Sequence, residues 1–345
     1  MTDDRSESLR PIFVIGNSRS GTTVMWNMLG RSPSVASVRE TDFYESFAGP
    51  RSSDETLTRE EAVRVWERLE QTQTRGLFYM VREQEEIEVA REMVDQHSLE
   101  GADPGRLYGA FLADRAVRGR GKPCEHTPRS VFTVDRMLED FPEARVINMV
   151  RDPRDIMISQ KNKWRRRWLG DGKMSLREMT TVMVNYHPIS ISLIWRGAIR
   201  AAIAVQEDPR VLFVRFEDMV GDPERTMSVV CDFIGIEYDQ DLLQVSHTRS
   251  SVRTDAPDRK GLDAARSQGW RNGGLSTVER WFCQKLNQRE MEAVGYEIER
   301  LRPNPLLILW NLLVLPFQTI AVLAVNRHRF KSLGHTIMTR LRLAR

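Results

Sequence analysis

Short apolar runs separated by helical patterns dominate the first two thirds of the chain. The run PIFVI at residues 11–15 is closed by Gly16 and predicts a buried strand. The sequence GTTVMWNMLG, which starts at Gly21, places apolar residues at helical spacing and predicts a helix directly after a short loop. Two further β-rich runs, RVINMV at 145–150 and VLFV at 211–214, are each followed by a helical pattern.

This alternation of strands and helices predicts an α/β fold with a mostly parallel sheet flanked by helices. Residues from about 51 to 120 break the alternation, since they are charged and helix-prone and contain no clear strand pattern. We interpret them as a helical insertion that covers a site. We expect one large domain over residues 1–300, followed by a segment of different character over residues 301–345.

The segment 306–325, LLILWNLLVLPFQTIAVLAV, contains no charge and is long enough to cross a bilayer. Four residues weaken its interpretation as a membrane span: Asn311, Pro316, Gln318 and Thr319. A span with a cytoplasmic body would place the basic residues that follow it outside, against the positive-inside tendency. We therefore favour an interfacial or hairpin-like association with the inner face of a membrane. The alternative is a helix that covers the protein's own core or a partner in a homodimer.

Positive charge is concentrated after that segment. The net charge of the 345-residue chain is +3, yet residues 326–345 carry six basic residues and no acid, so the remainder is slightly acidic. A basic segment beside a near-neutral body is typical of contact with a membrane surface or an anionic partner, and less typical of a nucleic-acid-binding domain. A solvated tail is the alternative.

The cysteines and the first residues indicate the compartment. Cys124, Cys231 and Cys283 are far apart and form no CxxC pair, so neither a disulfide framework nor a zinc site is expected. The first residues, MTDDRSESLR, contain no apolar run of the kind found in secretory signals. We expect a cytoplasmic protein, peripheral at the inner membrane face if the apolar segment binds lipid.

The loop between the first strand and the first helix has the composition of a phosphate-binding loop. It reads Gly16-Asn17-Ser18-Arg19-Ser20-Gly21-Thr22-Thr23. Glycines at both ends allow a tight turn, and the N–H groups of the loop and the helix N-terminus then face an anion. The spacing matches a Walker A loop, but Thr22 stands where that motif requires Lys. ATP-dependent kinase chemistry is therefore disfavoured, and Arg19 supplies the positive charge.

This loop resembles that of a known enzyme family. Ser18-Arg19-Ser20-Gly21-Thr22-Thr23 is similar to Pro-Lys/Arg-Ser-Gly-Thr-Thr, the 5′-phosphosulfate loop of sulfotransferases that use 3′-phosphoadenosine-5′-phosphosulfate (PAPS). Ser18 replaces the usual Pro, and Arg in place of Lys is similar to tyrosylprotein and many bacterial members. The resemblance implies PAPS as the donor, bound at its 5′ end by Ser18 to Thr23. No visible cluster of ligands requires a metal.

A second motif extends the resemblance. Arg151-Asp152-Pro153-Arg154-Asp155 directly follows the run at 145–150, and Ser159 lies eight residues beyond Arg151. This resembles the family's 3′-phosphate site, in which an Arg at a strand end and a Ser on the next helix bind the phosphate. A guanidinium suits a phosphate, which agrees with that role. A solvent-facing charge run is the alternative, but it leaves unexplained why both motifs follow a strand.

Two later stretches are also similar to the family. Val214-Arg215-Phe216-Glu217-Asp218 resembles a structural V-R-Y-E-D segment. The stretch Arg266-Ser267-Gln268-Gly269-Trp270-Arg271 resembles the loop that folds over the 3′-phosphate, which makes Arg266 and Arg271 candidates for binding it. Arg259-Lys260-Gly261 is an alternative at a shifted spacing.

The candidate general base is Glu40. In tyrosylprotein and related bacterial members, a Glu before Thr takes the acceptor's proton about twenty residues after the loop Arg, and Glu40 precedes Thr41. Burial would raise the pKa of such a carboxylate towards the working pH. Asp42 and Glu45 are weaker candidates, and a surface ion pair is the alternative role for Glu40.

The stretch Glu125-His126-Thr127-Pro128 stands where relatives often have Glu-Lys-Thr-Pro. His126 replaces the Lys that assists the leaving oxygen, and it would act as a base when neutral or as a cation when protonated. A structural hydrogen bond is the alternative, and Lys122 is a candidate to supply the missing charge. Arg19 would stabilise the bridging oxygen as adenosine 3′,5′-bisphosphate leaves.

The resemblance thus implies a sulfotransferase that acts by in-line transfer on a hydroxyl or an amine. The sequence leaves the acceptor open. Trp and Arg in the stretch 163–168, together with the apolar segment, favour a carbohydrate or a glycolipid. The alternative functions are a P-loop kinase and a non-catalytic nucleotide-binding membrane scaffold.

Overall fold

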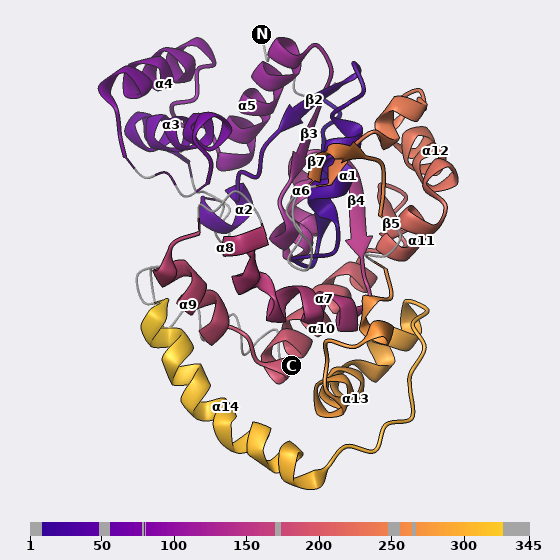
Figure 1. The fold of residues 1–345 in the computed structure, drawn as a ribbon. Coiled ribbons are helices and arrows are strands. Elements are labelled where there is room, and N and C mark those ends of the chain that lie inside the picture. The colour runs from indigo at the N-terminus through magenta and orange to yellow at the C-terminus, as the bar shows by residue number, and fades with distance from the viewer. Residues whose placement is uncertain are drawn as a thin grey trace. The chain divides into compact units, whose positions relative to one another are not determined.

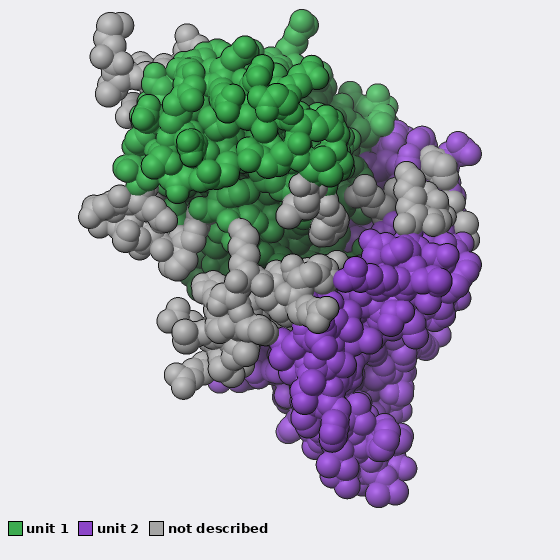
Figure 2. Space-filling view, turned by 90° about the vertical axis from the view of Figure 1, so that its left-hand side faces the viewer, with its two compact units in different colours: residues 1–149, 202–214, 224–243 green, residues 150–201, 215–223, 244–345 purple. Residues whose placement is uncertain are grey.

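The structure is a computed structural model that describes residues 9–47, 56–77, 79, 81–169, 174–247, 256–263 and 267–326. It divides into two compact units, coloured separately in Figure 2. Unit 1 contains residues 1–149, 202–214 and 224–243, and unit 2 contains residues 150–201, 215–223 and 244–345. The domain boundary expected near residue 300 falls within unit 2.

A five-stranded sheet has the strand order β2-β3-β1-β4-β5 (Figure 1). The strands are β1 Ile12–Gly16, β2 Val35–Val38, β3 Lys122–His126, β4 Arg145–Val150 and β5 Val211–Arg215. Strand β1 pairs in parallel with β3 and β4, and β2 pairs in parallel with β3. Every residue of β1 is buried, as its apolar run predicts. The expected α/β fold and the strands predicted from PIFVI, RVINMV and VLFV are therefore confirmed.

Helices flank the sheet and form most of unit 2. In chain order they are α1 Thr22–Leu29, α2 Phe43–Ser46, α3 Arg59–Thr74, α4 Gln84–Gln96, α5 Pro104–Gly119, α6 Val134–Asp140, α7 Pro153–Lys161, α8 Arg166–Leu169, α9 Leu176–Val184, α10 Pro188–Ala204, α11 Phe216–Gly221, α12 Pro223–Ile234, α13 Thr277–Ala293 and α14 Pro305–Val325. Shorter elements are the 3₁₀ helices η1 Pro128–Phe132, η2 Lys163–Arg165, η3 Gln240–Leu243 and η5 Gly269–Asn272, and the antiparallel pair β6 Ser246–His247 and β7 Ala256–Lys260.

The charged region expected to be helical contains α3, α4 and α5, and no strand among its described residues from 56 to 119. Thr58 forms a capping box with Glu61 at the start of α3. Asp103 caps α5, which begins with Pro104. Helix α5 packs against β2 and β3 in unit 1. That this region covers a substrate site stays a prediction.

Unit 2 has its own apolar clusters. Met157 and Ile158 of α7 pack with Trp270, Leu275 and Cys283. A second cluster joins Ile189 of α10 to Val278 and Phe282 of α13. The first cluster holds α7 beside the loop that contains Trp270, and both segments carry predicted site residues.

Candidate functional site

The loop after β1 is shaped by two glycines in unit 1. Gly16 has φ 143°, and a Cβ atom there would lie 2.3 Å from the carbonyl oxygen of Met149 on β4. Gly21 has φ 102° and directly precedes α1. Arg19 between them also has a left-handed backbone, with φ 74°. Such a conformation costs a non-glycine residue about 1–2 kcal/mol and is typical of functional loops.

The start of α1 is suited to an anion. No side chain caps this helix, and its first turn contains no acid. The hydroxyl of Ser20 is fully buried and has no hydrogen-bond partner among the described residues. A helix N-terminus with its positive dipole, beside a buried hydroxyl donor, is the arrangement that binds phosphate or sulfate. Of the other predicted loop residues, Thr22 is buried, Thr23 half-buried and Ser18 exposed.

The segment with the candidate base is tied to the end of β3. The carboxylate of Glu125 accepts hydrogen bonds from the backbone N–H of Thr41 at 3.1 Å and from its hydroxyl at 3.2 Å. Thr127 donates a further hydrogen bond to the same carboxylate oxygen. The backbone N–H of Asp42 donates to the Thr127 hydroxyl at 3.4 Å. Side chains of the Glu125-His126-Thr127 stretch thus hold in place the residues that follow Glu40.

Carboxyl groups concentrate in this part of unit 1. Burial, together with the negative charge of Glu40, raises the pKa of Glu125 to about 8, against the hydrogen bonds from Thr127 and Thr41. Burial also raises the pKa of Asp42 to about 7, helped by the charges of Glu45 and Glu40 and opposed by Arg129. Glu45 forms an ion pair with Arg129 at 2.9 Å. The structure therefore brings Glu40 within electrostatic reach of two carboxyl groups that are partly protonated at neutral pH.

These pKa shifts predict a pH dependence of stability. The pKa of Glu125 in the fold exceeds its ordinary 4.5, so the folded chain keeps a proton that the unfolded chain releases as pH rises from about 4.5 to 8. Stability should therefore fall over that window. Glu125→Gln keeps the accepting oxygen and removes the titration. We expect the loss of unfolding free energy between about pH 5 and pH 8 to shrink by on the order of 3 kcal/mol.

Denaturant unfolding at several pH values measures this effect. The control is Glu88→Gln, because Glu88 is exposed on α4 and contacts Gln84. The unfolding free energy of this control should fall with rising pH as steeply as that of the wild type. An unchanged slope in Glu125→Gln would mean that Glu125 is already ionised in the fold.

His126 lies at the end of β3 and stacks on Trp26 of α1, with ring centroids 4.5 Å apart and planes inclined by 23°. The indole N–H of Trp26 donates to the carbonyl oxygen of Cys124 at 3.0 Å. These contacts fix the imidazole beside α1, the helix that follows the loop after β1. Trp26 and Thr41 are positioning residues that the sequence did not reveal, because their partners are distant along the chain.

Lys122 does not compensate for the lysine that His126 replaces. It lies at the opposite end of β3, and its ammonium donates to the carbonyl oxygens of Ile234 at 2.6 Å and Gly235 at 2.8 Å. The five-residue strand separates it from His126 by about 13 Å, at about 3.3 Å per residue. Lys122 thus stabilises the end of α12.

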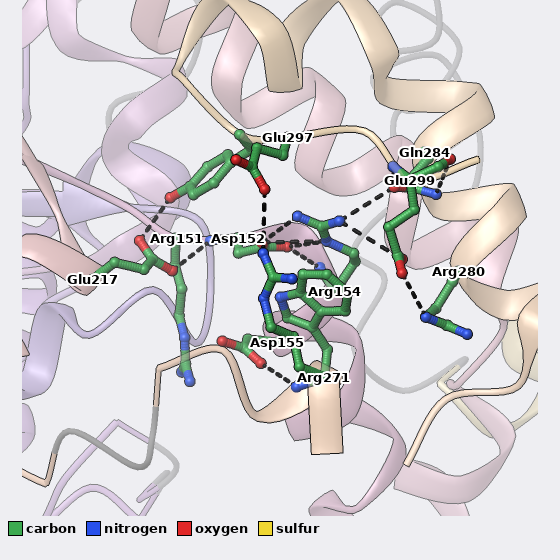
Figure 3. Close-up of polar contacts among 12 residues, drawn as sticks. Arg151, Asp152, Arg154, Asp155, Glu217, Arg271, Arg280, Gln284, Glu297 and Glu299 are labelled. Atoms are coloured by element: carbon green, nitrogen blue, oxygen red, sulfur yellow. Dashed lines mark hydrogen bonds and ion pairs between the residues drawn. The ribbon is translucent and has the colours of Figure 1, made fainter. Parts of the chain in front are cut away.

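In unit 2, Arg151 directly follows β4. Its guanidinium lies over the ring of Phe216 at 4.2 Å, and its backbone carbonyl accepts a hydrogen bond from the indole of Trp195 at 3.0 Å. Burial lowers the pKa of Arg151, while Asp155 and Glu217 oppose that shift. In Figure 3 the guanidinium extends away from the ion-pair network around Arg154. Ser159 is buried on α7, in the same unit.

Arg154 has a structural role. It is 1% exposed and forms a paired contact with Asp152, through Nη2 to Oδ2 at 2.7 Å and Nε to Oδ1 at 2.9 Å (Figure 3). Its guanidinium also lies 3.7 Å from the centre of the Trp270 ring and donates to Gln284 at 3.2 Å. The backbone N–H of Trp270 donates to Asp155 at 2.9 Å. The predicted 3′-phosphate motif and the Gly-Trp-Arg loop are therefore held together.

The remaining candidates differ in their surroundings. Arg271 is exposed, stacks on Trp270 at 4.5 Å and pairs with Glu297 at 3.3 Å. Arg266 lies outside the described residues. Lys260 on β7 donates to Ser246 at 2.7 Å.

Glu217, expected to be structural, has two hydrogen bonds within unit 2. Its carboxylate accepts from the backbone N–H of Asp152 at 3.0 Å and from the Tyr296 hydroxyl at 2.8 Å.

A mostly parallel sheet in this strand order, with a glycine-bounded loop leading into an uncapped helix after β1, defines a P-loop-like α/β protein. The family model described as "Sulfotransferase family" matches residues 11–240. The chain belongs to the sulfotransferase family, as its motifs predict.

Relatives agree with this membership. The chain is similar to carbohydrate sulfotransferase 1 of Mus musculus, with 26% identity over 226 residues that cover 58% of this chain and 52% of the relative. Sulfotransferase 2A6 of Rattus norvegicus is 30% identical over 129 residues, which cover 37% of this chain and 43% of the relative. The chain spans about half the length of the curated relatives it matches.

Solved structures support the fold. The sulfotransferase domain from the curacin biosynthetic pathway aligns with a TM-score of 0.51 and 17% identity, covering 84% of this chain and 99% of that domain. The sulfotransferase domain from the Synechococcus PCC 7002 olefin synthase gives a TM-score of 0.50 and 18% identity, covering 86% of this chain and 98% of that domain. At these identities the likeness concerns the fold.

Proposed function

We propose that this protein transfers a sulfuryl group from PAPS to a hydroxyl or an amine of an acceptor. The observation that carries the proposal is the loop after β1, which contains Arg19 and the buried Ser20 hydroxyl and leads into an uncapped helix, in a member of the sulfotransferase family. These groups fit a sulfated phosphate. Thr22 in the place of the Walker lysine argues against the use of ATP.

In this proposal the two motifs bind different ends of the donor. Ser18 to Thr23 in unit 1 would bind the 5′-phosphosulfate, through N–H groups, hydroxyls and Arg19. In unit 2, Arg151 and Ser159 would bind the 3′-phosphate, with Arg266 and Arg271 as further candidates. The packing of the Trp270 loop against Asp155 supports the inclusion of Arg271 in this set.

The transfer step needs a proton acceptor and charge stabilisation. An acceptor oxygen attacks the sulfur while the bond between sulfur and the bridging oxygen breaks, and Glu40 takes the acceptor's proton. Arg19 stabilises the charge that develops on the bridging oxygen as adenosine 3′,5′-bisphosphate leaves. His126, held by Trp26, would assist at that oxygen. The chemistry is positioning and charge neutralisation, as in phosphoryl transfer, and we expect it to proceed without a metal.

A carbohydrate or a glycolipid is the acceptor class that we favour. The similarity to carbohydrate sulfotransferase 1 over more than half of this chain supports a sugar hydroxyl. Trp164 and Trp168 form an edge-to-face pair at 5.6 Å in unit 2, and Trp168 is 61% exposed. An exposed indole beside arginines is suited to stacking on a sugar face.

Incubation of the full chain with ³⁵S-labelled PAPS and a lysate fraction of glycolipids and oligosaccharides tests the proposal. We expect label to appear in an acceptor, with adenosine 3′,5′-bisphosphate as the co-product, in buffer containing a metal chelator. Binding of adenosine 3′,5′-bisphosphate without transfer to any acceptor pool would favour a nucleotide-binding scaffold. Transfer from labelled ATP instead would identify a kinase.

A further inference from the structure

One face of helix α14 packs against the rest of unit 2, from Ile308 to Asn326 just after the helix. Ile308 and Leu315 pack against the cluster of Ile189, Val278 and Phe282. Further along, the Gln318 amide donates to the carbonyl oxygen of Val184 at 2.9 Å and also to that of Tyr186. After the helix, the buried Asn326 donates to the side chain of Asn185 at 2.8 Å. Figure 1 shows α14 beside α9, in agreement with their contacts.

The inner face therefore follows a spacing of three and four residues. It contains Ile308, Asn311, Leu315, Gln318 and Val322, all of them partly buried. Two of these five side chains are amides. In a water-soluble helix the amides would be expected on the solvent side and the apolar residues inside.

The outer face carries the large apolar residues. It is lined by Leu306, Leu309, Trp310, Leu313, Phe317 and Ile320, each more than half exposed. Trp310 is 64% exposed and Phe317 is 74% exposed. A continuous row of such side chains on one helix is much more apolar than an ordinary protein surface, and marks contact with a partner or a membrane.

Basic residues flank this helix on both sides. Arg300 and Arg302 precede it, and residues 326–345 contain six basic residues and no acid. The nearest acid before the helix, Glu299, already pairs with Arg280 at 2.8 Å. A helix with cations near both ends matches an anionic lipid surface, because both ends then meet headgroups of one leaflet.

We propose that α14 binds anionic membranes by lying in the plane of one leaflet, with its outer face in the acyl region and its inner face on unit 2. This inference is independent of the transfer activity. By length and composition α14 is the one helix among the described residues that is able to cross a bilayer. A span, however, would either detach Gln318 and Asn326 from their partners or draw α9, with Arg177 and Glu178, into hydrocarbon.

A second copy of the chain is a poorer occupant of the outer face. Pairing two α14 helices in parallel would place identical basic flanks together. Antiparallel pairing would do the same, because both flanks are basic. Anionic lipid removes this repulsion and covers the same apolar side chains.

Flotation of the full chain with sealed vesicles tests the proposal. We expect it to float with phosphatidylcholine vesicles that contain phosphatidylglycerol, more weakly at high salt, and least with phosphatidylcholine alone. The variant Trp310→Ser/Phe317→Ser should partition at least about 100-fold more weakly, since each buried aromatic side chain contributes about 1.5–3 kcal/mol of transfer free energy. Both positions are exposed, so unfolding midpoints should match the wild type.

The matched control is Val117→Ser/Val229→Ser, which removes exposed apolar groups from α5 and α12 and should float like the wild type. Extraction at alkaline pH should release the wild-type chain from the vesicles. Resistance to extraction would overturn the in-plane arrangement in favour of a span. Absence of flotation, together with a lipid-free dimer that Trp310→Ser/Phe317→Ser abolishes, would assign the face to a second copy and overturn the proposal.

Discussion

Glu40→Gln is expected to lower the rate of sulfuryl transfer by about 10²–10⁴-fold, the usual contribution of a general base. The substitution keeps the size of the side chain and removes its ability to take the acceptor's proton. Donor binding should change little, because the proposed contacts of the donor are made by other residues. Single-turnover transfer measures the rate, and calorimetry with adenosine 3′,5′-bisphosphate measures binding.

Substitution of a neighbouring carboxyl group tests whether Glu40 or that neighbour is the general base. Asp42 has a pKa of about 7 and Glu125 a pKa of about 8, and both are influenced by the charge of Glu40. If Asp42→Asn abolishes transfer while Glu40→Gln retains it, Asp42 is the base. The control is again Glu88→Gln on α4, which should transfer at the wild-type rate.

Arg151→Lys is expected to weaken the binding of adenosine 3′,5′-bisphosphate by roughly 10- to 100-fold. A lysine keeps the charge but loses the planar fork, and a hydrogen bond to a charged group contributes about 1.5–3 kcal/mol. Burial over Phe216 holds the guanidinium in one orientation, so a more flexible ammonium should replace it poorly. Titration calorimetry measures the two affinities.

The matched ligand is adenosine 5′-phosphosulfate, which lacks the 3′-phosphate. The wild type and Arg151→Lys should bind it with similar affinity, because the altered contact is absent. Arg118→Lys, at a half-exposed position on α5, controls for a change of cation alone. An equal loss of affinity for both ligands would place Arg151 elsewhere than at the 3′-phosphate.

The sequence predicted the fold from the strands that have a clear pattern. β1, β4 and β5 are apolar runs, and all three are present. β3 is an interior strand of the sequence KPCEH, in which a proline, a lysine and two other polar residues hide the strand pattern. Its neighbour β2, VASV, is too short for periodicity to decide.

The parts of the candidate site that lie within one short stretch of sequence were predictable. Residues 16–23 and 151–159 follow strands directly, so a motif alone indicates them. The hydrogen bonds of Glu125 to Thr41 and the stacking of Trp26 on His126 join residues up to about 100 positions apart. No spacing rule encodes such pairs, since they depend on which strands become neighbours. The expectation that Lys122 supplies the charge missing at His126 was wrong for the same reason.

All three cysteines of this chain are buried and none forms a disulfide. Burial raises the pKa of Cys124 and Cys283, and that of Cys231 to about 11, so each remains a thiol at neutral pH. Peroxide and alkylating reagents attack thiolates at accessible positions. The three native thiols of the folded enzyme should therefore resist these reagents, and a cysteine introduced on its surface would be a unique reactive handle for a thiol-specific label.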